Sequence, residues 1–401
     1  MEKTNGTSGT NGIKGINRAQ FLAGAAAVGL AGALLPTGRA EASGGGEEVG
    51  GEGVGGEGGG GRGLTRRGVV YTLVEGETPA TAFSLARMRE DIRVIRDDLH
   101  ADTVDVTGDG VERLTATAAE VAERGMHVWL QPTLTDRPQK ETLEHLAECG
   151  RFAERLRRQG ASVEFSVGCE FWLLVPGIVP GADVMERIRN LLSGTVDWEQ
   201  MQRRLDRFTA EAARVGRSVF RGRLSYAAAQ DDRVDWNLFD VVGIDYYSYH
   251  RDRREYVKEL KSYLRWGKPV AITEFGTCTY VGAPEAGGMG WDIVDYDKNP
   301  PEIKGNPVRS ERVQAAYVTD LLDVFESMNL YAAMAFEFLT ADAPHHPHDP
   351  LHDLDLAGYG ITKAVRDRPD DPDSPWRREP KEAFHALARR YARACRAGRK
   401  P

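Results

Sequence analysis

From residue 68 onward, short apolar segments alternate with longer amphipathic ones, and this alternation limits the chain to very few folds. Residues 69–74 are an apolar run typical of a buried strand, whereas residues 81–99 carry apolar side chains in steps of three and four, the period of a helix. Strands that are apolar along their whole length are typical of a parallel sheet that is covered on both faces. The pattern therefore predicts an α/β fold.

The alternation predicts eight strands, and their number selects the architecture. The predicted strands are 69–74, 102–106, 127–133, 162–168, 223–227, 239–247, 270–274 and 331–338. The predicted helices are 81–99, 113–124, 141–158, 198–215, 253–266, 311–328 and 380–397. This order is typical of a single (β/α)8 TIM barrel, which we place at residues 64–397. A doubly wound open sheet is the alternative, but it usually has a glycine-rich phosphate turn after its first strand, and none is present.

The first 42 residues have the layout of an export signal. Basic residues precede the apolar run 21–35, which is shorter than a membrane span, and residues 40–42 form a small-x-small cleavage site. The segment around Arg18 resembles a twin-arginine signal, although Ala19 stands where the second arginine would be. We predict a secreted or cell-envelope protein with no membrane span after signal cleavage. An uncleaved anchor is the alternative.

Residues 43–63 are almost all Gly and Glu, too poor in apolar groups to pack, and are predicted to form a disordered linker.

The whole chain has 52 Lys and Arg against 60 Asp and Glu, a net charge of −8. This balance argues against nucleic acid as a partner. It leaves the oligomeric state undetermined.

The cysteines give no sign of a disulfide framework or a zinc motif. They are few and scattered, at Cys149, Cys169, Cys278 and Cys395. A bridge between Cys169 and Cys278 is conceivable, but buried free thiols are the preferred interpretation. The histidines of residues 345–352 invite a metal hypothesis, but prolines break their spacing and no helix places two on one face. Neither a metal nor another cofactor is predicted.

Two glutamates follow apolar strands, Glu170 after the fourth and Glu274 at the end of the seventh. Chemistry in a TIM barrel takes place at the carboxyl ends of the strands. The two carboxyl groups could approach to about 5 Å, as in retaining glycosidases, where one protonates the leaving oxygen and the other attacks the anomeric carbon. A glutamate that only forms an ion pair with a neighbouring loop is the alternative for Glu274.

Three strand motifs resemble those of the clan A retaining glycoside hydrolases: Ser-Val-Gly-Cys-Glu at 166–170, Val-Gly-Ile-Asp-Tyr-Tyr at 242–247 and Ile-Thr-Glu-Phe-Gly at 272–276. The resemblance implies that Glu170 is the acid/base, that Glu274 is the nucleophile, and that Tyr246 or Tyr247 hydrogen-bonds the nucleophile.

The chain departs from this pattern at three places. Cys169 stands where the clan usually has an Asn that binds the sugar 2-hydroxyl. Residues 103–107 lack the Arg that often supports the nucleophile, and residues 336–338, with Glu337 at their centre, replace a Trp platform.

The barrel as a whole also resembles an actinobacterial group usually labelled abortive infection proteins. The shared motifs are Gly-Ile-Val-Pro-Gly at 177–181, Val-Asp-Trp at 234–236, Gly-Lys-Pro-Val at 267–270 and Thr-Glu-Phe-Gly at 273–276. The label by itself is not an argument for phage defence, because no residue pattern here points to a nuclease, a nucleotide-binding loop or a pore.

Other side chains are candidates for substrate binding because of their place after predicted strands. Aromatic rings stack on sugar faces, and a polar loop can close over a site. The predicted substrate-binding residues are Trp129 and Gln131 on the floor, Trp172, Trp291 and Tyr280 as walls, Glu337, and His345 and His346 in a covering loop. Residues 282–307 are long enough to act as a lid. Packing of the aromatic residues against the barrel is an equally good interpretation.

The sequence thus favours a retaining glycoside hydrolase that acts on an extracellular or cell-envelope glycan. A carbohydrate-binding barrel without turnover is the alternative, favoured by the missing Asn and Arg. An envelope interaction protein linked to phage defence is supported only by the group label.

Overall fold

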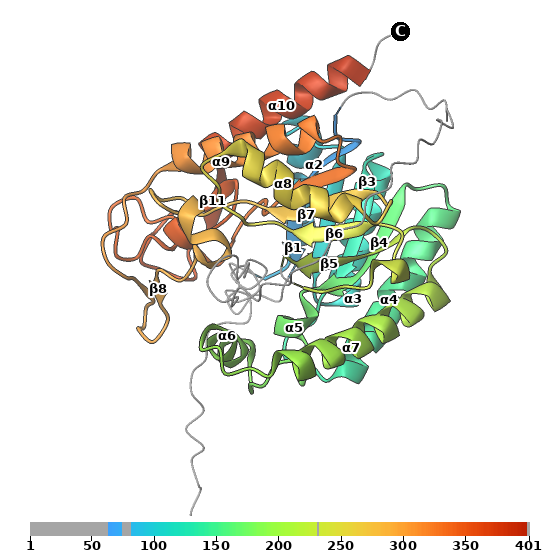
Figure 1. The fold of residues 1–401 in the computed structure, drawn as a ribbon. Coiled ribbons are helices and arrows are strands. Elements are labelled where there is room, and N and C mark those ends of the chain that lie inside the picture. Colours follow the sequence, from blue (N-terminus) through green and yellow to red (C-terminus); the bar gives the residue numbers. More distant parts are fainter. Residues whose placement is uncertain (1–62, 74–81, 231, 399–401) are drawn as a thin grey trace, which may run out of the picture.

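The computed structural model describes residues 63–73, 82–230 and 232–398. Eight parallel strands close into a barrel in the order β1-β10-β7-β6-β5-β4-β3-β2, which confirms the predicted TIM barrel (Figure 1). The strands are β1 (Arg66–Leu73), β2 (Thr103–Gly108), β3 (His127–Pro132), β4 (Val163–Cys169), β5 (Leu224–Ala229), β6 (Val242–Asp245), β7 (Val270–Phe275) and β10 (Ala332–Ala335). The predicted signal (1–42) and nearly all of the predicted linker (43–63) lie outside the described residues.

Amphipathic helices cover the outside of the barrel, and each buries one apolar stripe on the strands (Figure 1). In this outer layer of helices, α4 packs beside α7, and α9 packs beside α10. The helices are α2 (Leu85–Asp97), α3 (Val111–Glu123), α4 (Gln139–Arg158), α7 (Trp198–Val219), α8 (Arg253–Leu264), α9 (Glu311–Ser327) and α10 (Glu382–Gly398). These helices agree with the predicted ones to within a few residues at each end.

The connections between the strands, and the segment after β10, contain short elements that were not predicted. They are α5 (Phe171–Leu174), α6 (Val184–Leu192), η1 (Trp236–Leu238), η2 (Pro284–Met289), β8 (Val294–Asp295), β9 (Glu302–Ile303), η3 (Leu354–Ala357), β11 (Thr362–Arg366) and β12 (Trp376–Pro380). The proposed lid, 282–307, consists of η2 and the antiparallel pair β8–β9. The sixth and eighth strands are shorter than predicted, because the chain leaves the sheet after Asp245 and after Ala335.

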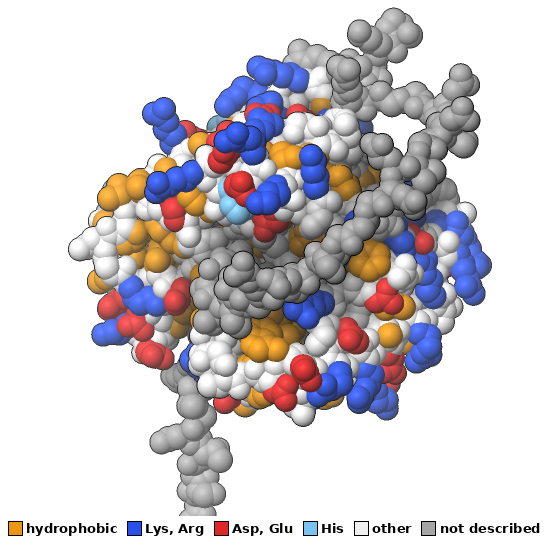
Figure 2. All heavy atoms as spheres, viewed as in Figure 1, with side chains coloured by type: hydrophobic (Ala, Val, Ile, Leu, Met, Phe, Trp, Pro, Cys, Tyr) orange, Lys and Arg blue, Asp and Glu red, His pale blue; other side chains and the backbone are white. Residues whose placement is uncertain are grey.

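The surface shown in Figure 2 has basic and acidic side chains interspersed. Among the described helices, none is both long and apolar enough to cross a membrane. Cys149, Cys169 and Cys278 are free and buried, as preferred from the sequence.

Gly108, the last residue of β2, allows the first two strands to approach closely. Its φ is +123°, and an added Cβ would lie 1.9 Å from the carbonyl oxygen of Leu73 at the end of β1. We expect Gly108→Ala to lower the free energy of unfolding by about 3 kcal/mol, because backbone must move to accommodate the methyl group. Chemical denaturation measures this change.

Gly125→Ala is the matched control for this prediction. Gly125 also has a positive φ, +74°, but nothing lies within 4 Å of its added Cβ. It should therefore cost only the conformational term of about 1 kcal/mol. Equal losses in the two variants would show that the close approach of β1 and β2 contributes nothing.

Candidate active site

Glu170 and Glu274 lie together at the carboxyl end of the barrel. Glu274 is the second-last residue of β7. Glu170 directly follows β4 and has a left-handed backbone conformation, with φ at 36°. Both side chains are buried, at 0% and 1% exposure. Burial raises the pKa of Glu274, and the nearby charges of Asp245 and Glu170 raise it further. The fold thus brings together the two carboxyl groups that the sequence singled out.

Only one of the two candidate tyrosines contacts Glu274. The Tyr247 hydroxyl donates a hydrogen bond of 2.7 Å to Oε2 of Glu274. The Tyr246 hydroxyl instead donates to Oε2 of Glu259 in α8, at 2.6 Å. Tyr246 also packs edge-on against Phe325 of α9, so it lies between the barrel and its helices. Of the two residues left open by the sequence, Tyr247 therefore lies at the site and Tyr246 does not contact the carboxyl pair.

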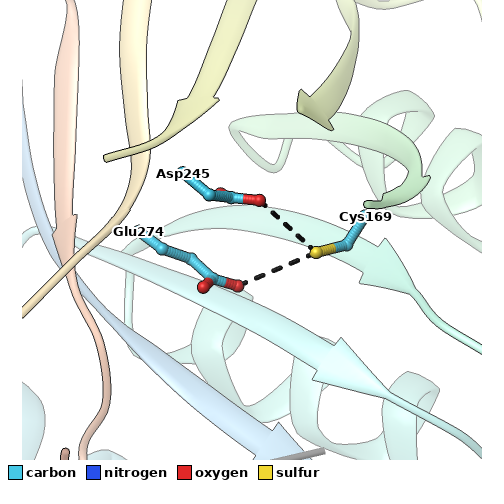
Figure 3. Close-up of side chains that lie close together, drawn as sticks. All are labelled: Cys169, Asp245 and Glu274. Atoms are coloured by element: carbon cyan, nitrogen blue, oxygen red, sulfur yellow. Dashed lines mark hydrogen bonds between the residues drawn. The ribbon is translucent and has the colours of Figure 1, made fainter. Parts of the chain in front are cut away.

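Two further side chains, Cys169 and Asp245, lie beside Glu274 (Figure 3). The Cys169 thiol lies 3.4 Å from Oδ2 of Asp245 and 3.9 Å from Oε1 of Glu274. The Thr273 hydroxyl donates a 2.7 Å hydrogen bond to Oδ1 of Asp245. The sequence analysis missed Asp245, although it carries the same signal as Glu274, a carboxylate at the end of an apolar barrel strand.

Asp105 of β2 is a fourth buried carboxyl group near the pair. It is 0% exposed, and neither of its carboxyl oxygens has a hydrogen-bond partner among the described residues. Burial raises its pKa well above the ordinary value, and the charge of Asp245 raises it further. Asp105 is the central residue of segment 103–107, in which the sequence analysis noted only that an Arg was lacking.

Burial is the main cause of the raised pKa values in this cluster. It raises the pKa of Glu170 and of Glu274 well above the ordinary value, and the charge of Asp245 raises both further. The pKa of Asp245 rises to about 7, because burial outweighs the hydrogen bonds from Thr273 and Cys169. Burial likewise raises the pKa of the Cys169 thiol. Among the described residues, the groups that shift the four carboxyl pKa values include no Lys, Arg or His.

The predicted floor and wall residues are mostly buried side chains with polar atoms that lack partners. Trp129, Gln131 and Trp172 are at most 1% exposed, and Trp291 is 5% exposed. Within the described residues, the indole nitrogens of the three tryptophans and Oε1 of Gln131 make no hydrogen bond. The Tyr280 hydroxyl donates to the carbonyl of Gly290 at 3.0 Å.

The remaining predicted binding residues have polar partners in the barrel or in its loops. Glu337 accepts hydrogen bonds from Thr72 at 2.6 Å and Thr340 at 2.8 Å, and burial raises its pKa to about 8. Nδ1 of His345 lies 2.9 Å from Asp353, and Nε2 of His346 lies 3.2 Å from Asp370. These histidines thus contact carboxylates of the loops rather than the Glu170–Glu274 pair.

Solved glycosidase structures have the same fold as this chain. A GH113 β-1,4-mannanase is 14% identical with a TM-score of 0.53, and the alignment covers 82% of this chain and 99% of the mannanase. A GH113 β-mannanase from Alicyclobacillus acidocaldarius is 13% identical with a TM-score of 0.51, covering 82% and 98%. A Bacteroides uniformis β-glucuronidase is 14% identical with a TM-score of 0.50, covering 82% and 35%. The fold is shared.

At this identity the likeness establishes the barrel architecture and no activity. No protein-family model matches the sequence, and no curated protein matches it. Nothing in these comparisons supports the abortive infection label.

Proposed function

We propose that this protein is a retaining glycoside hydrolase that acts on an extracellular or cell-envelope glycan. The observation that carries the proposal is the Glu170–Glu274 pair, buried at the ends of β4 and β7 and coupled electrostatically. Two such carboxyl groups suffice for hydrolysis with retention and need no cofactor.

The surroundings of the two glutamates support separate roles for them. Glu274 accepts the hydrogen bond of Tyr247, which favours its ionised form, whereas Glu170 has no hydrogen-bond donor among the described residues. The first proton is therefore lost from Glu274, and Glu170 retains its proton. Glu274 attacks the anomeric carbon while Glu170 protonates the leaving oxygen. Glu170 then removes a proton from water, which hydrolyses the glycosyl ester on Glu274.

Trapping with activated 2-fluoro glycosides tests the proposal. The full-length protein is incubated with a panel that includes β-mannosides and β-glucuronides, the sugar classes in the names of the structural neighbours, and is then examined by intact-mass spectrometry. We expect a covalent adduct that maps to Glu274. A folded protein that forms no adduct across a broad panel would contradict the hydrolase proposal.

Replacing Tyr247 by Phe should weaken the nucleophile. Loss of the 2.7 Å hydrogen bond raises the pKa of Glu274, so the acid limb of kcat/KM should move to higher pH. A hydrogen bond to a charged group is worth about 1.5–3 kcal/mol, so we expect a loss of about 10- to 100-fold. The pH profile of kcat/KM measures both effects.

Tyr246→Phe is the matched control, because the Tyr246 hydroxyl donates to Glu259 instead. Its pH profile should keep the wild-type acid limb. An identical shift in both variants would indicate a general loss of structure rather than a direct effect on Glu274.

A carbohydrate-binding barrel without turnover is the second candidate. The specific observation in its favour is Asp105, a buried acid in a segment where the clan A enzymes that the motifs resemble often have a supporting Arg. No cation among the described residues contributes to the pKa of Glu274. In that case sugar binding persists, but neither an adduct nor product forms.

A further inference from the structure

Three different potential metal ligands meet at the end of the barrel (Figure 3). Sγ of Cys169, a carboxyl oxygen of Asp245 and a carboxyl oxygen of Glu274 all lie within 4.8 Å of one another, and all three residues are buried. They belong to the ends of β4, β6 and β7; β6 and β7 are neighbours in the barrel, and β5 lies between β4 and β6. A ligand set on strands of one barrel is more rigid than one on loops.

The spacing of these atoms suits a tetrahedral ion. With bonds of about 2.3 Å to sulfur and about 2.0 Å to oxygen, the sulfur–oxygen edge of a tetrahedral zinc site is about 3.5 Å. Cys169 Sγ lies 3.4 Å from Asp245 and 3.9 Å from Glu274. Small side-chain adjustments would therefore place all three atoms at bonding distance of one ion.

Buried carboxyl groups near Cys169, Asp245 and Glu274 (the triad) would be stabilised by a positive charge. Asp105 and Glu170 are fully buried, all four of their carboxyl oxygens lack hydrogen-bond partners in the described part of the chain, and both interact electrostatically with Asp245. Buried unpaired carboxylates are costly unless a cation or a proton compensates them. A divalent ion at the triad would supply that charge without any Lys or Arg.

We propose that Cys169, Asp245 and Glu274 bind a thiophilic divalent cation, with Zn²⁺ as the best fit. A thiolate ligand favours zinc over magnesium or calcium, which prefer oxygen. On binding, the Cys169 thiol releases its proton to solvent and forms the sulfur–metal bond, with no change in oxidation state. Three protein ligands leave the fourth tetrahedral position for water or another ligand.

This site goes beyond the proposed glycosidase and shares one residue with it. Glu274 cannot coordinate an ion and attack an anomeric carbon at the same time. Bound zinc should therefore block glycosyl transfer to Glu274, and a chelator should restore it. The cation site would exist whether or not the protein turns over a glycan.

Cobalt(II) titration of the reduced, full-length protein tests the site without any activity assay. Cobalt(II) bound by a thiolate gives a charge-transfer band in the near ultraviolet, so we expect this band to saturate at one equivalent and to disappear when Zn²⁺ is added. Cys169→Ala should abolish the band. Asp245→Asn should weaken cobalt binding by about 10-fold or more.

Cys149→Ala is the matched control, since Cys149 is another buried thiol but lies in α4, outside the barrel. It should retain the band, and circular dichroism should show that all variants are folded. The proposal is overturned if the wild type gives no band, if the band persists in Cys169→Ala, or if folded Cys149→Ala loses it. Failure of the glycosidase proposal is a separate result, because it appears as a missing 2-fluoro adduct in metal-free protein.

Discussion

Replacing Glu274 by Gln should lower kcat/KM by about 10⁴-fold or more, the size of loss seen when a member of a catalytic unit is removed. The amide has the shape of the carboxyl group but cannot attack the anomeric carbon. Glu274 is 1% exposed and accepts the Tyr247 hydrogen bond, so the substitution changes charge within an unchanged environment. Steady-state kinetics on the substrate identified by trapping, together with loss of the 2-fluoro adduct, measures the effect.

Chemical rescue provides the control for this prediction. In Glu274→Ala, azide can enter the space left by the side chain and attack the sugar directly. We expect partial recovery of rate and a glycosyl azide of inverted configuration. Full activity in Glu274→Gln would remove Glu274 from the mechanism. A large loss without rescue in a folded Glu274→Ala would point to a role in binding.

Replacing Glu170 by Gln should have an effect that depends on the leaving group. General acid catalysis contributes about 10²- to 10⁴-fold, and we expect a loss in this range for natural glycans, whose leaving groups need protonation. Activated aryl glycosides should lose much less in the first step. Burial raises the pKa of Glu170 well above its ordinary value, and the wild-type rate should fall as pH rises through that pKa, because the acid is then lost. This basic limb should be missing in Glu170→Gln.

Glu164 offers a matched control on the same strand. It lies near the start of β4, at the opposite end from Glu170, where it contacts Arg223 and Tyr331. Glu164→Gln should lower stability but keep the leaving-group dependence and the basic limb. Equal behaviour of the two variants would contradict the assignment of Glu170 as the acid.

The sequence predicted the order of strands and helices because each element has a strong local pattern. The helix 141–158, for example, buries Leu146 and Leu156 on one face, and it is observed as α4 (Gln139–Arg158). The short α6 was missed because it lies in a loop between a strand and a longer helix. The sixth strand was predicted too long, since the apolar run continues into Tyr246 and Tyr247 after the chain has left the sheet.

The candidate site was predicted only in part. Glu170 and Glu274 were identified because a carboxylate after an apolar run stands out. Asp245 ends the apolar run of β6 and carries the same local signal, but it was overlooked. Asp105 lies in the middle of β2, where a single acidic residue gives no sign of which face it occupies. The choice between Tyr246 and Tyr247 depended on the direction of the chain after β6.

By itself, the sequence determined a barrel of eight strands and placed two glutamates at the ends of the fourth and seventh. Local periodicity and the position of charged residues after apolar runs are sufficient for both conclusions. Only the tertiary structure decided that Cys169, Asp245 and Asp105 join these glutamates in one buried cluster without a cationic partner among the described residues. The reason is that barrel closure sets which strand ends meet, and burial then determines how strongly their charges interact.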